Sequence, residues 1–300
     1  MGLFSKKTPC PICGGKISWF LPQKIEGEYV CDQCYFKIDM DKDKASRLTM
    51  QEFREYLAFY EQNQFLKDKF VISERIDFGV FDTKIIFDYQ NQLFCMSNEP
   101  NKTVFEGRQL KSFAIKEDKT PLFEGSAQGI RRYISTVPER ARALAPQISQ
   151  YMMNKQMTRA LDRLDNDKLN GSTAEQYFDV PEPFRKFNVE LHFDHPYWTV
   201  IKCDMDGPRF DNNYPDVNNY IRDYENCIKV MEKLATSLKT VAFPGMPEQV
   251  TGSGGAQAMA ATVQPPADPI EEIKKYKSLM EEGIISKEEF EAKKKQLLGI

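Results

Sequence analysis

The sequence predicts an α+β protein made of unequal parts: a small four-cysteine zinc ribbon, an antiparallel-sheet domain with a helical insertion and a closing helix, a flexible linker, and a C-terminal two-helix hairpin. Three observations lead to this prediction. Four cysteines form two close pairs near the N-terminus, the middle of the chain alternates between strand-like and helix-like apolar spacing, and residues 244–269 have almost no charge and no periodicity. Of the 300 residues, 41% are hydrophobic, which is enough for a sizeable core and about two domains.

The first predicted element is a metal module over residues 1–44. Cys10 and Cys13 are separated by two residues, as are Cys31 and Cys34, and this spacing lets both thiolates of a pair turn back toward one ion. Four sulfur ligands fill a tetrahedron and leave no position for water, which is typical of a structural zinc. We therefore expect one structural Zn²⁺ per chain and no catalysis at this site. The alternative is a redox or disulfide cluster of unligated thiols.

A connecting helix is predicted next, over residues 45–69. Apolar residues recur there at helical spacing. Thr49 followed by Glu52 matches a capping box, in which the two residues exchange hydrogen bonds at the start of a helix. We therefore expect an amphipathic helix directly after the metal module.

Residues 70–243 are predicted to form the sheet domain. Alternation of apolar and polar residues marks several strands, so a mostly antiparallel sheet is the simplest interpretation. Helical spacing over residues 125–170, including Ile130 and Ile134, predicts a helical insertion. The clearest helix is the closing one at 217–239, whose continuous apolar stripe predicts that it packs flat against the sheet.

The C-terminal residues are predicted to mediate assembly. Residues 244–269 are expected to be a flexible linker, followed by two short helices over residues 270–300. A hairpin this small buries too little surface to be stable alone, so we expect it to pair with its own copy in another chain. The apolar residues expected at that homo-oligomer contact are Ile273, Leu279, Ile284, Ile285, Phe290 and Leu297. The alternative is that the hairpin folds back on its own core.

Three segments resemble known families. The run from Leu279 to Leu298 closely resembles the short C-terminal module called SHOCT, which implies a two-helix oligomerisation unit found at the end of bacterial and phage proteins. The first 40 residues, with Met-Gly-Leu-Phe and Cys-Pro-Ile-Cys-Gly, resemble an uncharacterised N-terminal zinc-ribbon family that often accompanies SHOCT. The middle is more distantly similar to a bacterial PH-like domain, through its short strands, the run from Val104 to Ile115 and the closing helix. None of these resemblances implies catalytic residues.

Little in the sequence indicates an enzyme. His192 and His195 have opposite parity on a predicted strand, so we expect a solvent-facing histidine and a turn histidine, and not a second metal or acid–base centre. Cys95, Cys203 and Cys227 are expected to be buried thiols. The sequence has no glycine-rich phosphate loop after a predicted strand. We therefore predict a non-enzymatic protein.

Net charge and the expected cellular compartment reduce the number of function classes that the sequence supports. The net charge is −3, and residues 1–44 hold seven lysines against six acidic residues, so nucleic-acid binding has only weak electrostatic support. The sequence shows no secretory signal and no transmembrane segment, so we expect a cytoplasmic protein. The prediction is a non-enzymatic intracellular assembly or adaptor protein with an unidentified protein partner. The alternatives are a zinc-ribbon nucleic-acid-associated regulator and a PH-like module that recognises a protein or membrane surface.

Overall fold

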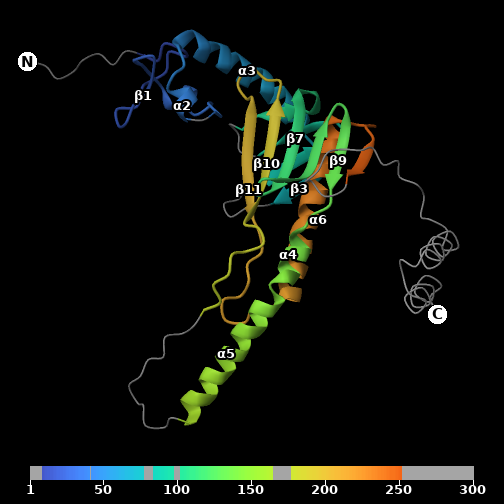
Figure 1. Cartoon of the computed structure of the whole chain (residues 1–300). Helices are drawn as coiled ribbons and strands as arrows, with labels where there is room; N and C mark the ends of the chain where they lie inside the picture. The colour runs from blue at the N-terminus through green and yellow to red at the C-terminus, as the bar shows by residue number, and fades with distance from the viewer. Residues whose placement is uncertain (1–8, 41, 78–83, 98–101, 165–176, 252–300) are drawn as a thin grey trace, which may run out of the picture. The chain divides into compact units, whose positions relative to one another are not determined.

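The computed structural model describes residues 9–40, 42–77, 84–97, 102–164 and 177–251 (Figure 1). The chain divides into two compact units, Met1–Gly255 and Ala256–Ile300. The second unit lies outside the described residues, and so do the predicted C-terminal hairpin and all residues expected at its oligomer contact. Within the described residues the protein is a mixed α+β structure with antiparallel sheets, which confirms the predicted fold class.

The N-terminal module is a small hairpin with short helices, followed by one long helix. Its elements are β1 (Gln23–Ile25), β2 (Glu28–Val30), α1 (Asp32–Tyr35), α2 (Lys42–Ala45) and α3 (Met50–Lys69). The predicted capping box starts α3: the Thr49 hydroxyl accepts from the N–H of Glu52 at 3.2 Å. In return, the Glu52 carboxylate accepts from the N–H of Thr49 at 2.8 Å. The predicted connecting helix is therefore present and begins at its predicted cap.

A four-stranded antiparallel sheet follows α3, in the order β3-β4-β5-β6. Its strands are β3 (Glu74–Asp77), β4 (Lys84–Asp88), β5 (Leu93–Cys95) and β6 (Val104–Glu106). A tight turn between β4 and β5 contains Asn91, whose N–H donates to the Asp88 carboxylate at 3.0 Å. Burial alone would raise the pKa of Asp88, but hydrogen bonds from the N–H of Val71 and from Asn91 lower it. A charged acceptor thus holds this hairpin.

A six-stranded sheet forms the rest of the domain, in the order β11-β10-β7-β8-β9-β12. The strands are β7 (Leu110–Glu117), β8 (Thr120–Ser126), β9 (Gly129–Tyr133), β10 (Lys186–Phe193), β11 (Val200–Asp206) and β12 (Glu248–Thr251), and η1 (Gly107–Gln109) links β6 to β7. Neighbouring strands are antiparallel except β12, which runs parallel to β9. Alternation in β10 buries one face, as the sequence predicts.

Two placements differ from the sequence prediction. Ile130, predicted in the helical insertion, lies in β9 and is 3% exposed. Ile130 and Ile134 are four residues apart, a spacing that fits both the helical period and the strand period, so the short pattern is ambiguous. Helical structure begins later, at α4 (Val137–Ala143) and α5 (Ala145–Leu164). The strand β12 lies within the predicted linker, where backbone pairing with β9 orders a segment that has no apolar alternation.

The closing helix α6 (Val217–Ala242) contacts strands of both sheets, including β3, β4, β7 and β8 (Figure 1). Its buried side chains include the predicted stripe of Tyr220, Tyr224, Met231, Leu234 and Leu238. Rings from the two sheets also meet, because Phe193 of β10 lies 6.0 Å from Phe94 and 4.7 Å from Phe105. The core is therefore shared by the two sheets and α6, and Val137 and Ala141 of α4 belong to it as well. Kinship with PH-like domains stays a prediction.

None of the helices in the described residues is both long enough and apolar enough to cross a membrane. The longest, α6, is amphipathic and uses its apolar stripe against the sheets.

Candidate metal centre

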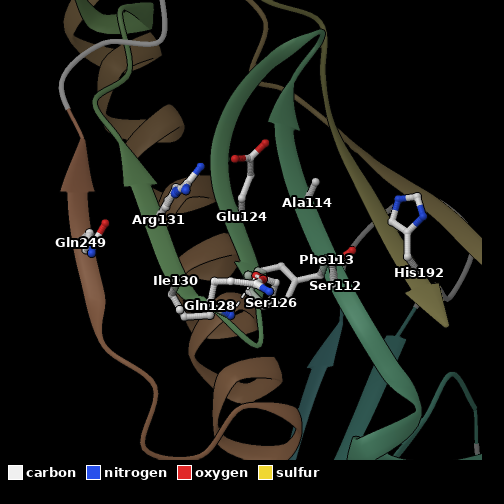
Figure 2. A pocket seen from close by; sticks show the side chains of 12 residues that line it. Ser112, Phe113, Ala114, Glu124, Ser126, Gln128, Ile130, Arg131, His192 and Gln249 are labelled. Carbon is white, nitrogen blue, oxygen red and sulfur yellow. Dashed lines mark hydrogen bonds between the residues drawn. The ribbon is translucent and has the colours of Figure 1, made fainter. Parts of the chain in front are cut away.

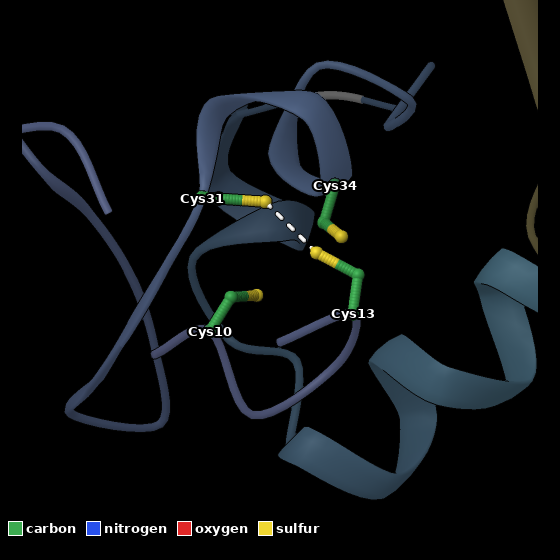
Figure 3. Close-up of side chains that lie close together, drawn as sticks. All are labelled: Cys10, Cys13, Cys31 and Cys34. Carbon is green, nitrogen blue, oxygen red and sulfur yellow. Dashed lines mark hydrogen bonds between the residues drawn. The ribbon is translucent and has the colours of Figure 1, made fainter. Parts of the chain in front are cut away.

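The four cysteines of the two predicted pairs come together in the N-terminal module (Figure 3). Their sulfur atoms all lie within 4.8 Å of one another, and Cys13 Sγ is 3.4 Å from Cys31 Sγ. In a tetrahedral site with Zn–S bonds of about 2.3 Å, neighbouring sulfurs are about 3.8 Å apart. The four donors therefore fit a single metal ion, and no side chain has to come from elsewhere in the chain.

The first pair lies on a turn that glycine makes possible. The N–H of Gly14 donates to the carbonyl of Cys10 at 2.8 Å, and Gly14 has a φ of +71°, a left-handed conformation that favours glycine. The N–H of Gly15 then donates to Cys13 Sγ at 3.4 Å. A Cβ atom at residue 15 would lie only 3.2 Å from the same sulfur. The turn therefore aims a backbone donor at a sulfur that becomes charged when it binds a metal.

The second pair lies at the start of a helix. Cys31 directly follows β2 in extended conformation, and its carbonyl accepts from the N–H groups of Cys34 and Tyr35 at 3.1 and 3.0 Å. This first turn of α1 brings the Cys34 side chain back toward Cys31 (Figure 3). The β1–β2 hairpin thus delivers the second pair to the first.

Burial and backbone N–H groups set the charge of the thiols. Cys10, Cys31 and Cys34 are at most 5% exposed, whereas Cys13 is exposed. Burial opposes ionisation of Cys10, but the N–H groups of Cys13 and Cys31 outweigh it, and the pKa of this thiol falls to about 6. Burial raises the pKa of Cys31 and of Cys34. A divalent cation that binds all four sulfurs must therefore displace protons from Cys31 and Cys34.

Few apolar side chains cover the metal centre, and some of them belong to α3. The buried cluster around it consists of three of the cysteines together with Ile25, Val30, Phe53 and Leu57. Phe53 and Leu57 belong to α3, and Arg54 of the same helix donates from Nη2 to the carbonyl of Pro11 at 2.9 Å. The first half of α3 is therefore an integral part of the metal module.

The same helix attaches the metal module to the sheets through neutral and charged hydrogen bonds. The Tyr56 hydroxyl accepts from the N–H of Asp39 at 2.8 Å, and the Asp39 carboxylate accepts from the N–H of Thr103 at 2.7 Å. Further along α3, the Asn63 side chain donates to the carbonyl of Val104 at 2.7 Å and accepts from its N–H at 2.9 Å. Asn63 therefore takes the place of a neighbouring strand at β6, the edge of the four-stranded sheet.

His195 is buried in an aromatic cluster at this joint. Its ring lies 5.1 Å from Phe59 of α3 and 4.8 Å from Trp198, and its Nδ1 accepts from the N–H of Tyr197 at 3.2 Å. The side chain is 8% exposed, and burial lowers the pKa of His195 to about 4. The histidine predicted at a turn is therefore a neutral core residue, because the segment after β10 folds back against α3.

His192 lies in a different environment, at a hollow on the outer face of the six-stranded sheet (Figure 2). The hollow has a volume of about 510 Å³ and forms where small side chains such as Ala114 leave room between taller neighbours. Glu124 and Arg131 rise from β8 and β9 on one side, and His192 rises from β10 on the other. The Glu124 carboxylate already accepts from the Tyr133 hydroxyl at 2.6 Å. The two histidines are thus separated, as the sequence predicts.

The fold and the cysteine cluster define an α+β protein with a four-cysteine metal module. Residues 8–56 match the model of a family described as Domain of unknown function (DUF4428), and residues 271–298 match that of the Short C-terminal domain, SHOCT. No curated protein and no solved structure matches the chain. The first match contains both cysteine pairs and ends inside α3. The second confirms the resemblance of the C-terminal residues to SHOCT.

The residues that join the metal module to the sheets are not identified by any motif in the sequence. Asp39 lies in the segment predicted from the cysteine pairs, and Tyr56 and Asn63 lie in a helix predicted from apolar spacing. Asn63 is the one residue whose position could have indicated such a contact, because it is a polar residue on the buried side of an amphipathic helix. A buried polar side chain requires a hydrogen-bond partner. The partner itself, Val104, lies 41 residues away and cannot be identified from spacing.

Proposed function

We propose that this protein is a non-enzymatic adaptor in which a structural Zn²⁺ holds the N-terminal module together and the C-terminal residues join copies of the chain. The single observation that supports it most is the closed set of four sulfur donors within 4.8 Å of one another. Such a set satisfies a tetrahedral ion completely and offers a substrate no open position.

Zinc is the metal that this donor set favours. Four thiolates in tetrahedral arrangement are typical of Zn²⁺ or an iron–sulfur site, and two short cysteine pairs on separate turns match structural zinc modules. When bound, the ion would replace thiol protons and link the first turn, the β1–β2 hairpin and α1. Backbone donors such as the N–H of Gly15 would then stabilise the sulfur charge.

The metal module would act as a rigid extension of the sheet domain. α3 contributes Phe53 and Leu57 to the cysteine cluster and Asn63 to the edge of the four-stranded sheet. Since one helix serves both regions, ordering the metal module fixes the direction in which its surface faces relative to the sheets. That arrangement suits a protein that presents surfaces to partners in the cytoplasm.

Self-association is assigned to residues 270–300 on their sequence. The match to the Short C-terminal domain covers residues 271–298. Apolar residues such as Leu279 and Phe290 recur on one side of two short helical patterns that could not bury them alone. A second copy of the chain offers the simplest complementary surface.

Native mass spectrometry of the full-length protein tests both parts of the proposal. The expected result is a homo-oligomer with one zinc per chain. Phe290→Asp should give a zinc-loaded monomer, whereas Ala292→Asp, which adds the same charge on the opposite side of the predicted helix, should leave the oligomer intact. A metal-free chain overturns the zinc assignment, and a wild-type monomer overturns the assembly role.

A further inference from the structure

The metal module carries an exposed apolar loop that its own fold does not use. Trp19, Phe20 and Leu21 are consecutive, and their exposed fractions are 81%, 67% and 73%. They lie between the first cysteine pair and β1, and none of them belongs to the buried cluster around the cysteines. Single exposed apolar residues are ordinary, but three neighbouring large ones form a patch that indicates an interaction surface.

The loop is held in a fixed shape that displays these side chains. The Ser18 hydroxyl donates to the carbonyl of Phe20 at 2.8 Å, and the side chain of Gln23 donates from Nε2 to the carbonyl of Leu21 at 3.3 Å. Leu21 has a φ of +48°, a left-handed conformation that is strained for a branched side chain. The rings of Trp19 and Phe20 meet edge to face at 6.0 Å. The backbone therefore carries strain to present a preformed apolar tip.

The charges beside the tip are lysines. Lys16 and Lys24 are the nearest charged residues along the chain on either side, and both are exposed. The acidic residues Glu26 and Glu28 lie at the far end of the β1–β2 hairpin, where the Glu26 carboxylate accepts from the N–H of Met50 at 2.8 Å. The tip is thus uncharged, and its flanks along the chain are cationic.

We propose that this loop inserts into the interface of an anionic lipid bilayer. Trp19, Phe20 and Leu21 would enter the boundary between headgroups and acyl chains, where an indole ring is favoured because its N–H meets water and its ring meets lipid. Lys16 and Lys24 would remain at the phosphate level and add electrostatic attraction. Among protein surfaces, an apolar hot spot is usually surrounded by a polar rim that excludes water from it. Here the nearest charged residues along the chain on both sides of the tip are lysines, which fits an anionic lipid surface.

The proposal is separate from the zinc and assembly roles, and flotation of the full-length, metal-loaded protein tests it. Vesicles of phosphatidylcholine with one quarter phosphatidylglycerol should carry the protein to the top of the gradient. Serine at all three tip positions, through Trp19→Ser, Phe20→Ser and Leu21→Ser, should lower partitioning about tenfold or more. The matched control, Met153→Ser with Met157→Ser, removes side chains that are 70% and 63% exposed on α5 and should leave flotation unchanged.

Tryptophan fluorescence identifies the inserted residue. The chain has two tryptophans, Trp19 and the partly buried Trp198 of the aromatic cluster. Vesicles should shift the emission to shorter wavelength and brominated lipids should quench it, and both effects should vanish in Trp19→Phe. Lys16→Gln with Lys24→Gln should weaken binding to anionic vesicles only.

Three results overturn the proposal. One is a wild-type protein that stays at the bottom of the gradient, and another is a triple serine variant that floats as well as wild type. The third is a triple serine variant with a changed oligomeric mass, together with a wild-type protein whose Trp19 emission does not change when vesicles are added. That result would assign the loop to contact with a second copy. Zinc content equal to wild type in each variant excludes misfolding as the cause.

Discussion

The metal module and the two-sheet domain solve the same stability problem in different ways. Three of the buried side chains around the metal centre are cysteines, and two more come from α3. The two-sheet domain instead buries a continuous apolar core that both sheets and α6 share. In the proposed function, metal ligation replaces hydrophobic burial in a module that is too short to form a core. The two regions should therefore fail under different conditions.

Removal of one cysteine ligand should produce the largest difference in stability between the two regions. Cys31→Ser takes away a buried donor, so the metal module should lose much of an apparent metal-binding free energy of about 10–16 kcal/mol and unfold while the sheets persist. Zinc content by mass spectrometry and far-ultraviolet circular dichroism measure the two effects. Cys227→Ser, which removes a thiol from α6, is the matched control and should keep the metal. A Cys31→Ser protein that retains one zinc contradicts the assignment.

Substitutions in α3, where the metal module joins the sheets, should have the next largest effect on the free energy of unfolding. Asn63→Ala leaves the N–H and carbonyl of Val104 buried without partners, which should cost about 2–5 kcal/mol of unfolding free energy. Gln64→Ala, at the adjacent position of α3, removes a side chain from the partly buried surface and should change the stability little. Urea unfolding measures both variants. Equal stability of the two variants would show that α3 does not complete the edge of β6.

His195 should make the two-sheet domain sensitive to acid. Burial lowers the pKa of His195 to about 4, below the ordinary 6.5, so the unfolded chain binds a proton more readily than the folded one. This contribution to stability is complete above about pH 6.5, falls as the pH drops toward 4, and amounts to at most about 3 kcal/mol. His195→Phe should flatten the slope of unfolding free energy between these pH values. A slope that His195→Phe leaves unchanged would contradict the assignment.

The sequence predicted the structure best where a short motif has one specific geometry. Paired cysteines identify the metal centre because a two-residue gap is a ligand geometry, and Thr49 with Glu52 marks a helix start because their hydrogen bonds are local. The same holds for the apolar stripe of α6, which is long enough to define its period.

The rest of the fold depends on contacts that spacing does not encode. Ile130 fits both periods, so only its pairing with Gly125 of β8 decides that it belongs to a strand. The strand β12 forms because it can pair with the edge of β9, and β9 lies more than a hundred residues earlier in the chain. The burial of His195 and the bonds of Asn63 follow from the docking of α3, which is a tertiary event.

The central claim is that a metal ion holds the N-terminal module while the sheets stand without it. Hydrogen exchange of the full-length protein, read by mass spectrometry before and after chelation, tests this claim most directly. Chelation should abolish protection in residues 9–40 and in the first turns of α3, and leave β7, β8 and β10 protected as before. Unchanged protection in residues 9–40, or a loss that extends through the six-stranded sheet, would contradict it.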